Sequence, residues 1–169
     1  MEVINNCQVL TSSPDRDCIE TLDLTAVKFT DYIGGCDTEG AVYSGHRLTD
    51  VLLTDPTGMT FDNTNTFYFT VSSGSAGGCI LSLDQTTDTV SSIHCETGLK
   101  FPGDMQHTLG SLLMAVDHGI YEYILSTGDT WWITGNNISG SELGAYREPR
   151  SFVMLDTGVG ILADKGNNR

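Results

Sequence analysis

The residues of this sequence with the most chemistry open to them are five cysteines, at positions 7, 18, 36, 79 and 95. None forms a Cys-x-x-Cys pair, which excludes the usual zinc-ribbon and thioredoxin-type sites. Cys18 opens the alternating segment CIETLD and Cys79 opens the segment CILSLD, and each is followed by a turn and a second alternating run. The later cysteine, Cys36 or Cys95, lies at or just after the end of that second run.

Two hairpins would bring these cysteines together. In the second, the pairs Asp84/Val90 and Cys79/Cys95 have the same index sum, so the cysteines face each other across the strands at a separation that a disulfide can bridge. We predict the disulfides Cys18–Cys36 and Cys79–Cys95, with Cys7 left over. A set of buried free thiols is the alternative.

Disulfides indicate an extracellular or secretory-lumen location, because cytosolic thiols are kept reduced. The sequon at Asn137 is a candidate glycosylation site and agrees with that location. The first residues have neither a basic n-region nor an apolar h-region, so we expect any signal peptide to lie upstream of this chain.

Histidines and aspartates supply the remaining candidates for metal chemistry. His107 is a candidate ligand or base, and a histidine held within a strand layer is the alternative. Asp117 and Asp164 recur 47 residues apart, as expected of carboxylates that accept hydrogen bonds from the amides of their own loops. No DxDxDG, HExxH or GxSxG motif is present, so we predict no cofactor, with zinc or calcium as the alternative.

Aromatic residues near the C-terminal third form a candidate interaction patch. Trp131 and Trp132 are adjacent, so in a strand they point to opposite faces, one buried and one exposed. Tyr121 and Tyr123 share one face of the preceding strand and are expected to extend the patch. Ordinary packing between sheets is the alternative.

Charge and length limit the classes of partner. The chain has 169 residues and a formal charge of −14, which disfavours nucleic acid and anionic membranes. No apolar run approaches the roughly 20 residues that span a bilayer, so membrane insertion is not expected. Length alone permits one domain.

A repeat organises the chain around three prolines, Pro56, Pro102 and Pro149, which are 46 and 47 residues apart. Met59/Phe61, Met105/His107 and Phe152/Met154 follow them as the first alternating positions. The first two units continue as a second apolar run and two further strands. Four short strands per repeat of 40–50 residues indicate an all-β protein with β-propeller blades of four antiparallel strands. A β-sandwich is the competing fold.

The phase of the repeat predicts where the blades fall. Residues 1–35 are the end of one blade, 36–98 and 99–135 are blades, and 136–169 start another. Because propellers have four to eight blades, one chain makes an incomplete ring. It is either part of a longer chain or self-assembles, its C-terminal strands completing the N-terminal blade of another copy.

The closing stretch from Gly160 to Arg169, GILADKGNNR, resembles the Asp…Asn…Arg core of NHL-repeat propellers. The segments that follow Trp132-Ile133-Thr134-Gly135 and Ile33-Gly34-Gly35 are similar to the linkers between blades of that family. Asp117 keeps the signature aspartate, whereas Ser72 and Ser73 stand at its place in the first repeat. The resemblance implies an NHL-type propeller.

These features favour a non-catalytic extracellular module that mediates protein–protein interaction or assembly. The alternative is a fragment of a metal-dependent propeller enzyme, because propellers related to the NHL type include lyases and lactonases with metal ions in the central channel. Only His107 could be assigned to such a site here. The RNA-binding NHL modules would require a basic face, which this chain lacks.

Overall fold

The computed structural model describes residues 1–5, 7–38, 40–62, 64–72, 77–100, 102–135, 146–155 and 159–167. Within these ranges the chain is all-β, as predicted, with antiparallel sheets and two 3-10 turns, η1 (Pro14–Arg16) and η3 (Lys165–Asn167). The sequence explains this high strand content, because short segments of alternating apolar and polar residues are separated by turns that contain Gly, Asp and Thr. No helix in the described ranges is long and apolar enough to cross a membrane.

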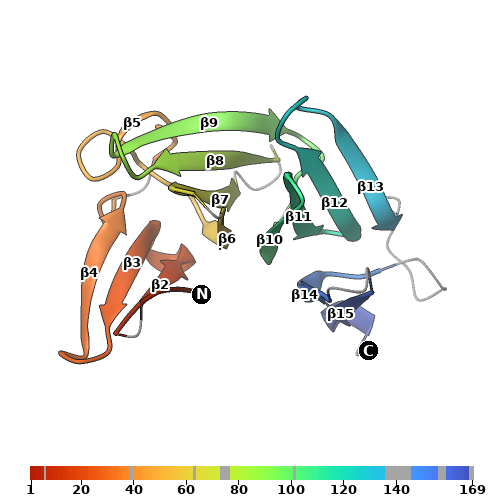
Figure 1. Ribbon diagram of the computed structural model, residues 1–169, viewed down its shortest axis with the longest axis horizontal. Helices are drawn as coiled ribbons and strands as arrows, with labels where there is room; N and C mark the ends of the chain where they lie inside the picture. The colour runs from red at the N-terminus through yellow and green to blue at the C-terminus, as the bar shows by residue number, and fades with distance from the viewer. Residues whose placement is uncertain are drawn as a thin grey trace.

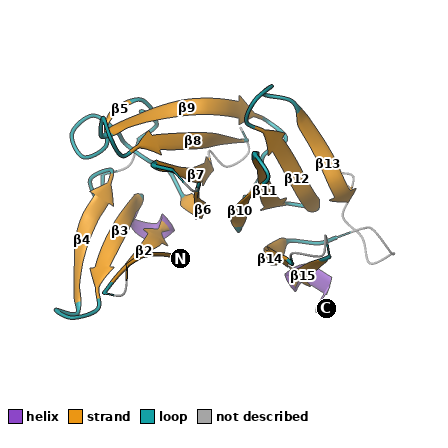
Figure 2. Cartoon of the chain, in the orientation of Figure 1, coloured by secondary structure: helices purple, strands orange, loops and turns teal. Residues whose placement is uncertain are grey.

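The strands form four sheets that follow one another along an arc (Figures 1 and 2). The first sheet contains β1 (Glu2–Asn5), β2 (Gln8–Ser13), β3 (Cys18–Asp23) and β4 (Lys28–Ile33); the second contains β6 (Pro56–Phe61), β7 (Thr66–Ser72), β8 (Gly78–Asp84), β9 (Thr89–Glu96) and the short edge strand β5 (Gly45–His46); the third contains β10 (Met105–Thr108), β11 (Ser111–Val116), β12 (Gly119–Ile124) and β13 (Thr130–Gly135); the fourth contains β14 (Pro149–Met154) and β15 (Gly160–Asp164). Strands pair in chain order, apart from β5, which pairs with β9. β6 and β10 lie on the concave side of the arc, and β4, β9 and β13 lie on its convex side (Figure 1).

The first sheet differs from the prediction that the chain opens partway through a unit. Glu2–Asn5 pairs with β2, with Val3 opposite Val9, so this sheet has a four-strand set of its own. Four residues with two adjacent apolar side chains were too short a pattern to distinguish from an unstructured terminus. The first sheet therefore has four consecutive strands, β1 to β4, rather than the three that the sequence predicted.

A separate core layer lies between each consecutive pair of sheets. Leu10 and Ile19 of the first sheet pack with Phe67 and Phe69 of the second. The other face of the second sheet packs on the third, and the other face of the third packs on Phe152 of the fourth. Each interior sheet is thus covered on both faces, while the two end sheets are covered on one face by described residues.

Contacts between the innermost strands recur at the repeat spacing. The backbone N–H of His107 donates to Thr60 Oγ1 at 3.2 Å, and that of Asp104 donates to the carbonyl oxygen of Arg150 at 3.1 Å. A Cβ added at Gly103 would lie 2.8 Å from the Arg150 oxygen, and one added at Gly58 would collide with the Gly103 oxygen. Glycine at both positions therefore permits the close approach of neighbouring sheets.

A bulge recurs between the third and fourth strands of the first three sheets. The register shifts by one residue after Ile19 in β3, Ile80 in β8 and Ile120 in β12. The extra residue in the partner strand is Tyr32 in β4, Ile93 in β9 and Ile133 in β13, as the shifted pairings require. These three side chains hold equivalent positions, and we call them the bulge residues.

Asp164 lies in the C-terminal segment that was compared with the NHL signature. Its carboxylate is buried, accepts the backbone N–H of Arg147 at 2.9 Å and accepts the Asn167 side-chain amide at 2.7 Å. Asp117, one repeat earlier, instead lies beside His118, with 3.2 Å between Oδ2 and Nε2. This backbone amide belongs to the segment that precedes the repeat proline, whereas the prediction assigned to Asp164 the amides of its own loop.

Aspartates also close the outer hairpin turns. Asp23 accepts two backbone N–H groups of its turn at 2.7 and 2.9 Å, and Asp84 accepts two at 2.7 and 3.3 Å. Because these hydrogen bonds favour the charged carboxylate, they lower the pKa of Asp23 and Asp84.

This arrangement predicts acid sensitivity. Each of these carboxylates has a lower pKa in the folded chain than in the unfolded chain, so its charged form stabilises the fold. This stabilisation is fully present above the ordinary carboxyl pKa of about 4 and is lost as the pH falls through the pKa of the folded chain. We expect the free energy of unfolding, measured by urea titration, to fall with pH below that value. The fall should be shallower in Asp84→Asn, which does not titrate, and parallel curves for the two proteins would contradict the assignment.

Candidate interaction surface

Both predicted cysteine pairs are joined in the structure. The Cα atoms are 4.9 Å apart in Cys18–Cys36 and 4.1 Å apart in Cys79–Cys95, and Cys7 is free and exposed. The predicted constant register of the second hairpin is wrong near its turn, where Leu83, not Asp84, faces Val90.

The bulge at Ile93 corrects this register. Ile80 pairs with His94 whereas Leu81 pairs with Ser92, so one extra residue separates the turn from the cysteines. The shift brings Cys79 opposite Cys95. The pairing of the cysteines therefore depends on a bulge that the alternating pattern did not predict.

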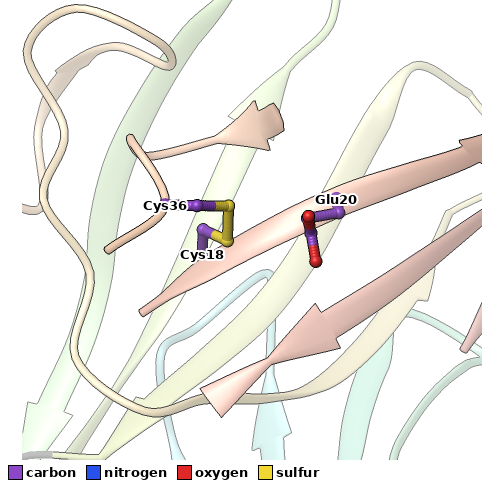
Figure 3. Close-up of side chains that lie close together, drawn as sticks. All are labelled: Cys18, Glu20 and Cys36. Atoms are coloured by element: carbon purple, nitrogen blue, oxygen red, sulfur yellow. A yellow bond between two sulfur atoms is a disulfide. The ribbon is translucent and has the colours of Figure 1, made fainter. Parts of the chain in front are cut away.

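Glu20 lies beside the first disulfide, as Figure 3 shows. The carboxylate and the sulfurs of Cys18 and Cys36 lie within 4.8 Å of one another, a spacing that could hold a metal ion. The two sulfurs, however, are bonded to each other. The carboxylate is also engaged, because Oε1 contacts the Arg16 guanidinium at 2.7 Å and Oε2 accepts a hydrogen bond from Ser13.

Arg16 extends this cluster to the loop that carries Cys36. Its guanidinium donates to both carboxylate oxygens of Asp37, at 3.2 and 3.1 Å, and this pairing lowers the pKa of Asp37. The ion pairs and the disulfide therefore join β3 to the same loop. We interpret the Cys18–Glu20–Cys36 cluster as a structural connection between β3 and that loop.

His107 does not face the concave centre as the metal hypothesis required. Its ring stacks on Tyr68 of the second sheet, with 6.2 Å between centroids and 17° between planes. Within the described ranges, the Cys18 group is the one cluster with metal-ligand spacing, and His107 is not part of it. Its register on β10 places it beside Leu112, on the face that packs against the second sheet.

The concave centre itself is an open hollow of about 410 Å³. Residues of the first, second and fourth sheets and of the segment that leads into β10 line it, among them Ser12, Thr57, Ser151 and Asp104. Ser151 donates to Asp104 Oδ2 at 2.9 Å, so part of this polar lining is already paired.

The two tryptophans lie on opposite faces of β13, as predicted. Trp132 packs edge-on against Tyr121, with 5.5 Å between ring centroids, whereas Trp131 is 60% exposed. Tyr121 and Tyr123 are 2% and 7% exposed and belong to the core between the second and third sheets. The prediction that they extend an exposed patch is wrong, because their register places them on the Trp132 face.

A groove of about 220 Å³ borders β13 and β15. Its lining is mostly apolar: Ile120, Ile133, Tyr146, Phe152, Ile161 and Leu162. Ile133 is 51% exposed, and Trp131 extends the apolar surface along β13. We call the groove together with Trp131 the β13–β15 surface.

The other two bulge residues are covered by the following sheet. Tyr32 packs edge-on against Phe67 of the second sheet at 6.1 Å, and Ile93 packs on the core of the third, where Tyr123 donates to its carbonyl oxygen at 3.4 Å. Ile133 is the exception. Ile93 is covered by β12, the third strand of the following sheet. The described part of the fourth sheet has two strands, and neither covers Ile133 in the equivalent way.

The outer edge of β15 has no partner strand among the described residues. Leu155 donates its N–H to Val159, and Val153 lies opposite Ile161, so Ile161 is in a hydrogen-bonded pair with β14. Hydrogen bonds alternate along an antiparallel strand. The N–H groups of Gly160 and Leu162 therefore point to the free edge beside the groove.

Ile133 and the β15 edge are the features of this surface that sequence reasoning missed. Ile133 lies two residues from Trp131, so strand alternation could have grouped the two side chains. The glycosylation candidate Asn137 lies outside the described residues.

The comparisons with known proteins bear on the fold of this chain and not on its function. No protein-family model matches the chain, and no curated protein matches it. The structure is similar to that of a structural genomics protein of unknown function from Bacteroides thetaiotaomicron, with a TM-score of 0.54 and 20% identity. The likeness covers 64% of this chain but 30% of that one, and it shows a shared fold over that part.

Proposed function

We propose that this chain is part of an NHL-type β-propeller and acts as a non-catalytic module for protein–protein contact. The propeller assignment is supported by four consecutive sheets along an arc and by contacts between inner strands at the repeat spacing, His107 to Thr60 and Asp104 to Arg150. The Asp164–Asn167 contact, in the segment that resembles the NHL signature, is a further observation in its favour.

The exposed β13–β15 surface is the observation that carries the proposed function. Ile133 is 51% exposed here, next to the exposed Trp131, whereas Tyr32 and Ile93 at the two preceding positions are partly buried. Tryptophan is enriched among the residues that dominate binding energy at protein interfaces. A contiguous apolar surface of this kind marks an interaction site.

The compartment follows from the cysteines. Two disulfides in a chain of this size favour an oxidising environment, and we place the protein in the extracellular space or the secretory lumen. The charge of −14 favours basic or neutral protein partners over nucleic acids.

Selection of binders tests the proposed function. Proteins selected from a displayed library on the immobilised chain should favour the β13–β15 surface and lose affinity for Trp131→Thr/Ile133→Thr. The expected loss is about 2 kcal/mol or more, because truncating a central tryptophan removes a dominant contact. Threonine keeps the strand propensity, so the fold should be retained.

Phe29→Thr is the matched control, because Phe29 is 52% exposed on the first sheet. It should leave the affinity of these binders unchanged. Binders that hold the Trp131→Thr/Ile133→Thr variant as tightly as the unmodified chain would contradict the function assigned to this surface.

A further inference from the structure

We propose that the disulfide Cys79–Cys95 is a thiol–disulfide exchange site, which a dithiol opens in the folded chain while Cys18–Cys36 stays closed. The dithiol attacks the sulfur of Cys95. This inference is independent of the β13–β15 surface, because it concerns two neighbouring strands of the second sheet.

The two cysteines are joined across neighbouring strands of one sheet. Cys79 of β8 lies directly opposite Cys95 of β9, and their Cα atoms are 4.1 Å apart. Disulfides usually have Cα separations of about 4.4 to 6.8 Å, and a bond held outside its relaxed geometry is more easily reduced. Cys18–Cys36, which joins a strand to a loop, lies within that range at 4.9 Å. Opening Cys79–Cys95 therefore relieves a constraint that the other disulfide does not carry.

The sulfurs also differ in their access to a reactant. Cys95 is exposed, whereas Cys79 is 9% exposed and belongs to the core between the first and second sheets. Exchange begins when a thiolate attacks an accessible sulfur of the disulfide. The incoming thiolate therefore attacks Cys95, and Cys79 is the leaving group. The other disulfide offers less access, because Cys18 is fully buried and Cys36 is half-buried.

A serine hydroxyl lies beside the exposed sulfur. Ser92 Oγ is 3.2 Å from Cys95 Sγ, and the hydroxyl is the donor because a disulfide sulfur carries no hydrogen. Residues three apart in a regular strand face opposite ways. The bulge at Ile93 puts both side chains on one face, since Ser92 pairs with Leu81 and Cys95 pairs with Cys79. A hydroxyl that donates to sulfur stabilises the thiolate when Cys95 is released.

The reductant is a dithiol because two thiols complete the exchange. Its first thiolate forms a bond to Cys95 Sγ, and the sulfur–sulfur bond to Cys79 breaks. The Cys79 sulfur leaves with the electron pair and takes a proton from solvent. The second thiolate of the reductant then attacks the reductant's own sulfur in the mixed disulfide and releases Cys95 as a thiolate, which is also protonated from solvent. The dithiol loses two protons and two electrons and becomes a cyclic disulfide, while the chain gains two thiols.

The second sheet keeps its strand pairing without this bond. β8 and β9 are paired at six other positions, and β6 and β7 continue the sheet on the far side of β8. The reduced chain therefore stays folded and holds its two thiols opposite each other. In that state Cys95 can form the disulfide with Cys79 again, or a mixed disulfide with a thiol of another molecule.

Differential alkylation of the folded chain tests the order of opening. The oxidised Cys7→Ala chain, which has no free thiol, is treated with dithiothreitol, and excess N-ethylmaleimide stops the reaction at successive times. Peptide mass spectrometry then measures the labelled fraction of each cysteine. We expect Cys79 and Cys95 to be labelled at least about tenfold faster than Cys18 and Cys36. In concentrated urea the two disulfides should open at nearly the same rate, because the fold no longer distinguishes them.

Limiting N-ethylmaleimide added to the reduced chain identifies the reactive sulfur. Cys95 should be labelled at least about tenfold faster than Cys79, because it is the accessible thiol. Ser92→Ala should slow the labelling of Cys95, because the variant removes the donor that stabilises its thiolate. An unchanged rate in this variant would contradict the role given to the hydroxyl.

Three results would overturn the exchange site. They are equal rates of opening for the two disulfides of the folded chain, earlier opening of Cys18–Cys36, and faster labelling of Cys79 than of Cys95. Circular dichroism of the chain with only Cys79–Cys95 open supplies a further check. An unchanged spectrum supports a reversible site, whereas loss of the β-sheet signal would make the bond a structural one and contradict the proposal.

Discussion

Replacement of Phe67 by alanine is expected to lower the free energy of unfolding by about 3–5 kcal/mol, the usual range for a phenylalanine deleted from a core. Phe67 is fully buried at the junction of the first and second sheets. Its ring lies 4.8 Å from that of Phe61, 5.6 Å from that of Phe69 and 6.1 Å from that of Tyr32. The loss combines transfer of the ring to water with a cavity that β-sheet backbone cannot collapse to fill.

Phe29→Ala is the matched control for this prediction. Phe29 pairs with Leu22 on the face of the first sheet turned away from that core, and it is half-exposed. Its replacement should change the free energy of unfolding by less than about 1 kcal/mol. Urea titrations of both variants provide the measurement, and equal losses would mean that Phe29 is covered by a packed layer.

The double variant Cys18→Ala/Cys36→Ala should lose about 3 kcal/mol of stability, as expected for a loop of this length. The disulfide spans 18 residues and joins β3 to the loop leading into the second sheet. Removing it frees the unfolded chain, while the Arg16–Asp37 pair still holds the folded loop. Alanine is chosen because Cys18 is fully buried and a hydroxyl there would be unsatisfied.

Cys7→Ala controls for the loss of a thiol. Cys7 is exposed and unpaired. The free energy of unfolding of this variant should therefore equal that of the unmodified chain to within about 0.5 kcal/mol. A double variant that is no less stable than Cys7→Ala would show that the Cys18–Cys36 bond does not constrain the chain.

Much of the fold follows from local pattern. Alternating segments and turn residues predicted short antiparallel strands, and the prolines at positions 56, 102 and 149 marked where β6, β10 and β14 begin or lie close by. β1 and β5 were missed because neither contains enough alternating residues. Each is defined by the strand it pairs with, which is a tertiary property.

Register was the harder part of the site. Adjacency alone separated Trp131 from Trp132, because neighbouring residues in a strand face opposite ways. The alternation also put Tyr121 and Tyr123 on one face, but which face is buried depends on the second sheet packing there. The bulges at Ile93 and Ile133 could not be predicted, because an inserted residue looks like any other in an alternating run.

Amide hydrogen exchange along β15 tests the central claim most directly, namely that this strand has an open edge beside an apolar surface. In the isolated chain we expect the N–H groups of Gly160 and Leu162 to exchange rapidly, and those of Ile161 and Ala163, which face β14, to be protected. Equal protection of all four amides in the isolated chain would contradict the account, because the edge would already be paired.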